Sequence, residues 1–373
     1  MNKAKRNYGI DLFRVVSLIG VIILHILGHG GVLDATEQGL NYQIIWLLEL
    51  LAFPAVNCFV LISGFVGYKS EKSYPKLKNI ISLFFTVIFY CTCICVAIQL
   101  ISPDNVDIFD LFQSFFPVLT KQYWFFTMYF AVFLLSPMLN LLVNKANAEM
   151  LGIGFVTIVI LSFSDTLTDI FVFKNGYSVI WFMALYLIGA IMKKYDIANK
   201  ISVPVSVIGA AAMLIFTWLM KIYLPTFSIG ILGISNIGDK LVSYCSPAML
   251  MLAIFLLCLF NKMKISKKLN PVIAFLSSSA FSVYLIHENK HIRRLLIKDN
   301  FEFLAEKNPF VTIALVIAFA IGIYLICTFA DKLRMLIFKL FKVDTISAKL
   351  EDIIKSLFKK CFAFLTDKTS HNT

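Results

Sequence analysis

Residues 8–31 have the sequence YGIDLFRVVSLIGVIILHILGHGG, an apolar run with a few polar residues inside it. About 20 apolar residues in a helix cross the roughly 30 Å of hydrocarbon in a bilayer, so this run is long enough to span a membrane. It follows a basic amino-terminal tail, as a signal peptide does, but Arg14 and His25 lie within it and no small-residue cleavage site is evident. We therefore expect a retained membrane span.

Similar runs recur along the whole chain. Of its 373 residues, 59% are hydrophobic and 15% are charged, whereas soluble domains have about 25% charged residues. This composition excludes a disordered chain and an ordinary soluble enzyme. Ten runs bounded by charged residues, Gly, Pro or Asn lie near residues 8–31, 41–67, 80–101, 123–143, 151–172, 177–192, 201–222, 241–260, 271–287 and 309–330. We predict an all-α polytopic integral membrane bundle of about ten transmembrane helices.

The distribution of charge predicts an orientation. The net charge is +12, which in a membrane protein marks cytoplasmic loops, so we expect no nucleic-acid partner. Lysines cluster in segments 69–78, 193–200 and 262–268 and in the tail, whereas the intervening segments are richer in Asp. The positive-inside rule then places both termini in the cytoplasm.

Two parts of unequal size are expected. Residues 1–330 form one transmembrane domain, and residues 331–373 form a basic cytoplasmic tail. Within the tail, apolar residues recur at helical spacing, and lysines occupy the other positions. The apolar set is Leu350, Ile353, Ile354, Leu357, Phe358, Cys361, Phe362 and Leu365. We expect an amphipathic interfacial helix that binds the lipids of the inner leaflet, with a helix that binds a protein partner as the alternative.

Ionisable residues inside a span are costly and are functional candidates by default. Arg14 and His25 are eleven positions apart, which places them on one helix face about 16 Å apart along the axis. Arg14 has the fork geometry that binds a phosphate or carboxylate, and His25 lies deeper as a candidate base. The alternatives are an Arg14 that snorkels to headgroups and pairs with Asp11, and a His25 that is a satisfied core residue.

Glu49 is the next such residue, about eight residues into the second span. Because the second span is antiparallel to the first, Glu49 and His25 have similar depths. A carboxylate that accepts one imidazole N–H fixes the tautomer and raises the basicity of the other nitrogen. We therefore hypothesise a catalytic His25–Glu49 pair.

Later candidates lie at the outer ends of spans. Trp124 belongs to the segment QYWFF, for which an aromatic belt is the alternative explanation. His287, Glu288 and His291 form a polar cluster followed by two arginines, for which a solvated loop is the alternative. His287 and His291 are four residues apart and could bind a metal, but no third ligand motif accompanies them, and the cysteines at 91, 93 and 95 lack the spacing of a zinc site, so we expect no metal.

Four motifs together resemble the membrane acyltransferase-3 family, bacterial enzymes that O-acylate cell-surface glycans. Arg14 followed by ten residues and His25 is similar to the family's first-helix signature. The stretch Asn57–Phe65, NCFVLISGF, resembles its Ile-Ser-Gly-Phe motif, Tyr123–Phe126 resembles its Trp-Phe segment, and Tyr284–His287 resembles its Tyr-Leu-x-His motif. They occur in the family's order across about 280 residues.

The resemblance implies transfer of an acyl group, commonly acetyl, from cytoplasmic acyl-CoA (acetyl-CoA) to a hydroxyl of an extracytoplasmic or lipid-linked saccharide. Arg14 and His25 are then essential, His25 in acyl transfer and Arg14 in donor binding or in shaping the site. The family's Arg-rich motif is replaced here by the lysine-containing loop 69–78, so Lys76 and Lys78 are carried over as donor-binding residues. The residues expected to bind the saccharide are Trp124, Tyr284, His287, Glu288 and His291.

Several alternatives stay open at this stage. His25 can act as a general base or can carry the acyl group as an acyl-imidazole. The rival class is a secondary transporter or flippase for an anionic or glycolipid substrate, because buried Arg, His and Glu also suit an ion-coupled pathway. A non-catalytic member of a glycan assembly complex is the third alternative, and a homo-oligomer is compatible with all three.

Overall fold

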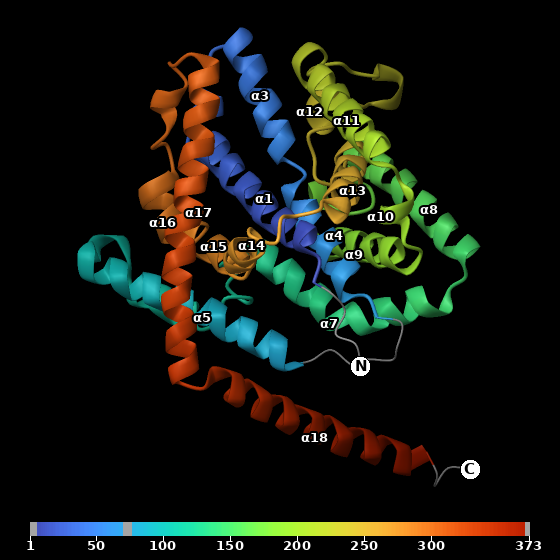
Figure 1. Ribbon diagram of the computed structural model, residues 1–373, viewed down its shortest axis with the longest axis vertical. Helices are drawn as coiled ribbons and strands as arrows, with labels where there is room; N and C mark the ends of the chain where they lie inside the picture. The colour runs from blue at the N-terminus through green and yellow to red at the C-terminus, as the bar shows by residue number, and fades with distance from the viewer. Residues whose placement is uncertain (1–5, 70–76, 370–373) are drawn as a thin grey trace.

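The protein is an all-helical bundle crossed at one end by a separate helix (Figure 1). The computed structural model describes residues 6–69 and 77–369, without the side chains of residue 232 and residues 362–369. In this part of the chain the β-type pairing is limited to an isolated bridge between Ile229 and Ile234. The prediction of an all-α fold is confirmed.

Among the described residues, seven helical segments are long and apolar enough to cross a membrane. Two of them combine neighbouring elements: Tyr8–His29 contains α1 (Tyr8–Leu24) and a π-helical turn, and Leu40–Gly67 contains α3 (Leu40–Ala52) and α4 (Ala55–Gly67). The others are α5 (Leu77–Ile101), α7 (Trp124–Lys145), α8 (Ala148–Thr168), α11 (Val203–Tyr223) and α17 (Pro309–Leu340). The chain is therefore a multi-pass membrane protein.

The other three expected spans are shorter in the structure. Helices α9 (Val179–Lys194) and α13 (Pro247–Lys262) have 16 residues each, about 24 Å of helix against about 30 Å of hydrocarbon. The expected span 271–287 is divided into α14 (Asn270–Ser277) and α15 (Ala280–His287). Helix α9 packs against α4 and α7, and α13 packs against α11 and α4. Half or more of the residues of α9 and of α13 are buried among the neighbouring helices, whereas α14 exposes Val272 and Phe275.

Short elements connect the helices. The helical ones are α2 (Val32–Ala35), α6 (Ile108–Ser114), α10 (Ile197–Lys200), α12 (Ile237–Lys240) and α16 (Lys290–Ile292), with single turns at Pro103–Asn105, Lys174–Gly176, Gly230–Leu232, Arg293–Ile297 and Glu302–Leu304. They lie between the long helices, where the backbone changes direction.

Helix α1 lies inside the bundle and contacts α3, α4, α13, α14, α15 and α17. The side chain of Asn7 caps it by accepting hydrogen bonds from the N–H groups of Gly9 and Ile10. Small residues allow close approach to α4, because a Cβ at Gly20 would lie 3.1 Å from the Cβ of Ala55. This packing encloses the polar residues of α1 within protein.

The last span and the tail differ from the expected boundary. Helix α17 ends at Leu340, ten residues beyond the expected end at 330, because its register continues through the charged residues 331–339. After a turn at Lys342, which has φ 52°, helix α18 (Val343–Thr369) runs alongside α5 across the bottom of the bundle (Figure 1). Its apolar residues Ile353, Leu357 and Phe358 are exposed. The predicted amphipathic helix is present, and its contact with lipid stays a prediction.

Candidate active site

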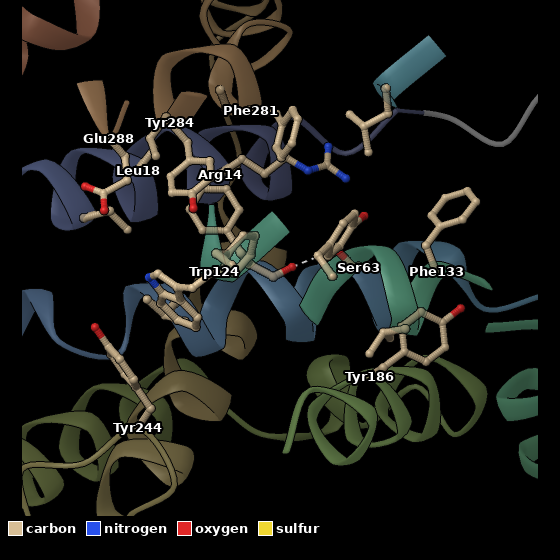
Figure 2. A pocket seen from close by; sticks show the side chains of 18 of the residues that line it. Arg14, Leu18, Ser63, Trp124, Phe133, Tyr186, Tyr244, Phe281, Tyr284 and Glu288 are labelled. Carbon is tan, nitrogen blue, oxygen red and sulfur yellow. Dashed lines mark hydrogen bonds between the residues drawn. The ribbon is translucent and has the colours of Figure 1, made fainter. Parts of the chain in front are cut away.

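A cavity of about 950 Å³ lies along α1 and receives side chains from both of its ends. Arg14 and Lys69 line it near the end where α1 begins, and His25 and Glu288 line it near the opposite end. In Figure 2, Trp124 lies across the cavity from Glu288. The two residues predicted from their spacing, Arg14 and His25, therefore face one continuous space.

The first span ends in a π-helical turn from His25 to His29. The N–H of Gly30 donates to the carbonyl oxygen of His25 at 2.8 Å, which closes this wider turn. Single π turns are rare and often occur at functional sites. Here the turn brings the rings of His25 and His29 to a centroid distance of 5.2 Å, and both residues line the cavity.

His25 is hydrogen-bonded to a second histidine. Its Nδ1 lies 3.1 Å from Nε2 of His287, and Nδ1 of His287 lies 2.6 Å from the carbonyl oxygen of Val283. A carbonyl oxygen only accepts, so Nδ1 of His287 carries the proton. In a neutral His287 the Nε2 atom is then the acceptor, and His25 donates to it from Nδ1.

The tautomer of His25 follows from this chain of hydrogen bonds. With its proton on Nδ1, neutral His25 has its lone pair on Nε2. The side chain is 15% exposed and lines the cavity. The arrangement therefore leaves Nε2 as the nitrogen that can accept a proton or attack a carbonyl carbon.

Glu288, rather than Glu49, is the carboxylate beside His25. Its Oε2 atom lies 3.2 Å from Nδ1 of His25 without a hydrogen bond, and its Oε1 atom accepts from Arg293 at 2.5 Å. The predicted His25–Glu49 pair is wrong. Glu288, the residue after His287, supplies the carboxylate because α15 ends against the π turn that follows α1. The similar depths of Glu49 and His25 in their spans do not show which side chains meet.

Glu49 lines the same cavity but has no ion-pair partner among the described residues. The residue is 7% exposed, and Oε2 makes no hydrogen bond in this part of the chain. An unsatisfied buried polar atom costs about 1–3 kcal/mol. Glu49 is therefore a polar group of the cavity wall that is available to a ligand.

Arg14 is held in place by a neighbouring carboxylate. Its Nη1 donates to Asp11 at 2.8 Å, one turn earlier on α1, and Arg6 also donates to Asp11. Asp11 is 4% exposed, and two guanidinium groups compensate its charge. The alternative pairing with Asp11 is thus present, and the same Arg14 also lines the cavity.

The predicted donor-binding lysines have different outcomes. Lys76 lies outside the described residues. Lys78 lies in the first turn of α5 and is not among the described residues of the cavity wall. Its Nζ lies 3.8 Å from a carboxylate oxygen of Asp344 on α18. Lys69 and Asn79 are the residues of this region that line the cavity.

The residues predicted to bind the saccharide separate into two groups. Trp124, Tyr284 and Glu288 line the cavity, and the hydroxyl of Tyr284 has no hydrogen-bond partner among the described residues. His287 and His291 are buried and are not among the described residues of the cavity wall. His287 lies behind His25 and orients it, and substrate contact by His287 or His291 stays a prediction.

Three residues that the sequence analysis did not select hold the loop after α15. Tyr123 donates to the carbonyl oxygen of Leu285 at 2.7 Å, and Asn289 donates to the hydroxyl of Tyr123 at 3.1 Å. Arg293 forms the ion pair with Glu288. Tyr123 directly precedes Trp124, Asn289 directly follows Glu288, and Arg293 is one of the two arginines that follow the polar cluster, so their positions near predicted site residues were the available signal.

An ion pair also fixes the loop after α15 to α6. Lys290 donates a hydrogen bond to Asp110. Burial alone would raise the pKa of Asp110, but this hydrogen bond and one from the backbone of Asp107 hold the pKa below its usual value. Burial lowers the pKa of the neighbouring His291. Asp110 is therefore ionised at neutral pH.

One cluster has the spacing of metal ligands. Ligand atoms of His25, His29 and Glu288 all lie within 4.8 Å of one another. However, Nδ1 of His25 is directed to His287 and Glu288 is paired with Arg293, so two of the three groups already have partners. The expectation that the protein uses no metal stays a prediction.

Comparison with known proteins gives one match. A family model described as an acyltransferase domain, acyltransferase 3, matches residues 7–330. No curated protein and no solved structure matches the chain. The matched range contains the whole cavity, from Arg14 to Arg293.

Proposed function

Because the chain belongs to the acyltransferase 3 family of membrane acyltransferases, we propose that it transfers an acetyl group from acyl-CoA to a hydroxyl of a saccharide. The supporting observation is that Arg14, His25 and Glu288 line one cavity, with His287 hydrogen-bonded to His25 behind the cavity wall. The donor binds with its phosphates near Arg14 and Lys69, where lysines and arginines complement their charge. The saccharide binds near His25.

The reaction at His25 follows from its tautomer. Nε2 accepts the proton of the saccharide hydroxyl while the oxygen attacks the thioester carbonyl carbon. The C–S bond then breaks, and the imidazolium returns the proton to the leaving thiolate, so the products are an ester and a free thiol. Glu288 stabilises the positive charge that His25 carries between these steps. General-base help of this kind contributes about 10²–10⁴-fold to the rate.

The acyl-imidazole route uses the same nitrogen. In that route Nε2 attacks the thioester itself, the thiol leaves, and the saccharide hydroxyl takes the acyl group in a second step. If the protein, mixed with acyl-CoA in the absence of saccharide, rapidly releases an amount of thiol equal to the amount of protein, the acyl-imidazole route operates. Steady release without a burst indicates direct transfer.

The protein is placed in the bacterial cytoplasmic membrane with both termini inside, since the donor is cytoplasmic and the lysine-rich segments lie on that side by the positive-inside rule. Anionic lipids bind α18, and the saccharide reaches the histidine end of the cavity from outside. A homo-oligomer is compatible with this arrangement, because the cavity is formed within one chain.

The test is acyl-CoA turnover by the purified protein in liposomes, with labelled acetyl-CoA and free thiol as the readout. His25→Ala is expected to lower kcat by at least about 100-fold, and Arg14→Ala to raise the KM for acetyl-CoA. The matched control is Arg294→Ala, which replaces an arginine outside the cavity wall and should retain turnover.

One outcome would reject the acyltransferase proposal. If the wild-type protein neither binds nor consumes acetyl-CoA in the presence of saccharide acceptors, the acyltransferase proposal fails. Flux of anions and glycolipids across the same liposomes then tests the transporter alternative.

A further inference from the structure

One face of α7 follows the cavity from one end toward the other. Its residues recur at intervals of three and four, and all of them line the cavity: Phe125, Tyr129, Phe133, Ser136 and Asn140. From the first to the last of these residues the face extends about 22 Å along the helix axis. Figure 2 shows Phe133 at the end toward which the guanidinium of Arg14 extends, opposite the end that holds Glu288.

The arginine end of the cavity is lined by two aromatic rings and two neutral polar side chains, which we call the α7–α9 pocket: Phe133, Tyr186, Ser136 and Asn140. Tyr186 belongs to α9, which packs against α7, and its ring lies at the same end of the cavity as the ring of Phe133 (Figure 2). The cations Arg14 and Lys69 line the cavity here as well. Flat apolar surface, neutral hydrogen-bonding groups and positive charge therefore occur together.

Ser136 faces this pocket as a hydrogen-bond acceptor. Pro137 lies inside α7 and has no N–H, so the carbonyl oxygen of Phe133 lacks its usual helical donor. The hydroxyl of Ser136 donates to that carbonyl oxygen at 2.7 Å. Since the hydroxyl proton is used in this bond, the lone pairs of the Ser136 oxygen remain for a ligand that donates.

Asn140 supplies a donor with a defined orientation. Its Nδ2 donates to the carbonyl oxygen of Gly67, and its Oδ1 accepts from the hydroxyl of Tyr186, each at 3.3 Å. A carbonyl oxygen only accepts, so the contact with Gly67 places the NH₂ group on that side and fixes the orientation of the amide. The second N–H of Nδ2 has no hydrogen bond within the described part of the chain. It is available to an accepting atom of a ligand.

An adenine ring fits these features. Its flat π surface stacks on aromatic side chains, as bases do in proteins that bind single-stranded nucleic acids. Its edge carries an amino group that donates, complementary to Ser136, beside a ring nitrogen that accepts, complementary to Asn140. Hypoxanthine has a carbonyl oxygen in place of the amino group, so it would present an acceptor to the acceptor of Ser136.

The position of the pocket also matches the arrangement of groups in CoA, whose adenine and phosphates lie at one end and whose thiol lies at the other. Arg14, Lys69 and the α7–α9 pocket lie at one end of the cavity, and His25 lies at the other. A donor bound with its base in the pocket therefore directs its thioester toward His25.

We infer that the α7–α9 pocket binds the adenine of the donor, so that the protein recognises acyl-CoA by its nucleotide and discriminates against thioesters that lack one. This inference rests on the proposed function for the identity of the donor as acyl-CoA. It assigns recognition of the base to side chains of α7 and α9, apart from the acyl transfer at His25.

The test measures binding without an acyl group and without saccharide. CoA, its hypoxanthine analogue and 4′-phosphopantetheine are titrated into the purified full-length protein in detergent, and calorimetry gives each Kd. The third ligand retains the thiol arm and one phosphate of CoA but lacks the nucleotide. The wild-type protein should bind CoA at least about tenfold more tightly than either of the others, which is ~1.4 kcal/mol.

The variants separate base recognition from a general loss of structure. Phe133→Leu, which keeps an apolar side chain but removes the ring, should weaken CoA about tenfold and leave 4′-phosphopantetheine unchanged, whereas Phe133→Tyr should retain the affinity for CoA. Ser136→Ala should reduce the preference for adenine over hypoxanthine. Phe163→Leu, which replaces an exposed ring on α8 outside the cavity wall, should change none of the affinities.

Three results would overturn the inference: equal affinity of the wild-type protein for CoA and 4′-phosphopantetheine, no preference for adenine over hypoxanthine, or an affinity for CoA unchanged by Phe133→Leu. Acyl transfer is followed separately as thiol release from acetyl-CoA and from acetyl-4′-phosphopantetheine. Equal release from the two, dependent on His25, would retain the proposed function and reject the base site. Tight CoA binding that depends on Phe133, without release from either thioester, would retain the base site and reject acyl transfer.

Discussion

At the residue scale, the reactivity of His25 depends on two neighbours that do not themselves react. His287 fixes the proton on Nδ1 through its own bond to the carbonyl oxygen of Val283. Glu288 adds a negative charge 3.2 Å from the same nitrogen. Such oriented support is what distinguishes an effective general base from an isolated histidine.

Glu288→Gln should therefore lower kcat without a comparable change in the KM for acetyl-CoA. The substitution retains the size of the side chain but removes the charge that stabilises the imidazolium. We expect a decrease of about 100-fold, or ~2.7 kcal/mol in the activation free energy. The measurement is steady-state thiol release, with Glu306→Gln as a control on an exposed carboxylate. A kcat within twofold of wild type would show that Glu288 does not act on His25.

At the element scale, α4 and α9 are held in close contact by glycines. A Cβ at Gly64 would lie 2.1 Å from the carbonyl oxygen of Tyr186, and a Cβ at Gly189 would lie 2.2 Å from that of Leu61. Small residues at such crossings permit close backbone approach between membrane helices. Since α4 and α9 both carry cavity-lining residues, this crossing sets the width of the cavity.

Gly64→Ala should destabilise the protein, because the methyl group cannot fit without moving one helix. Overpacking of this kind costs about 1–3 kcal/mol. The comparison is Gly152→Ala in α8, where no atom lies within 4 Å of the added Cβ and alanine favours a helix by about 0.5–1 kcal/mol. Thermal unfolding in detergent should show a lower midpoint for Gly64→Ala than for Gly152→Ala. Equal midpoints would contradict close packing at this crossing.

At the scale of the whole molecule, orientation can be tested with a native cysteine. Cys93 and Cys361 are the exposed cysteines among the described residues, and Cys361 lies on α18. In a Cys93→Ser background, a membrane-impermeant maleimide should label Cys361 in inverted vesicles and not in right-side-out cells, because the positive-inside rule places the tail in the cytoplasm. Labelling of Cys361 in intact cells would contradict this orientation and place the tail outside the cytoplasm.

Much of the fold could be predicted because hydropathy and length report directly on membrane spans. The exceptions are α9, α13 and the broken pair α14 and α15, which are apolar but short. Hydropathy does not distinguish a short helix enclosed by protein from one that crosses the bilayer. The break at Ser278 and Ser279 is a local backbone feature with no apolar signal.

The candidate site was predictable where its residues share one helix. Arg14 and His25 follow from helical periodicity within α1. The contact of His25 with Glu288 joins residues that are 263 positions apart, and periodicity carries no information about it. Glu49 is a buried carboxylate, as the sequence predicted, but it does not pair with His25. Helix rotation and packing decide which carboxylate meets a given histidine.

A cavity that extends along α1 also bears on the electrical insulation of the membrane. Moving one elementary charge across a potential of 100 mV changes its energy by about 2.3 kcal/mol, so a continuous file of water here would drain the ion gradient. Between Arg14 and His25, however, the cavity wall is formed by Leu18 and Val21, joined by Val56 and Phe125. Apolar side chains hold water weakly, so this part of the wall opposes a continuous file of water. We therefore expect the apolar side chains that shape the reaction space to act also against proton leakage across the bilayer.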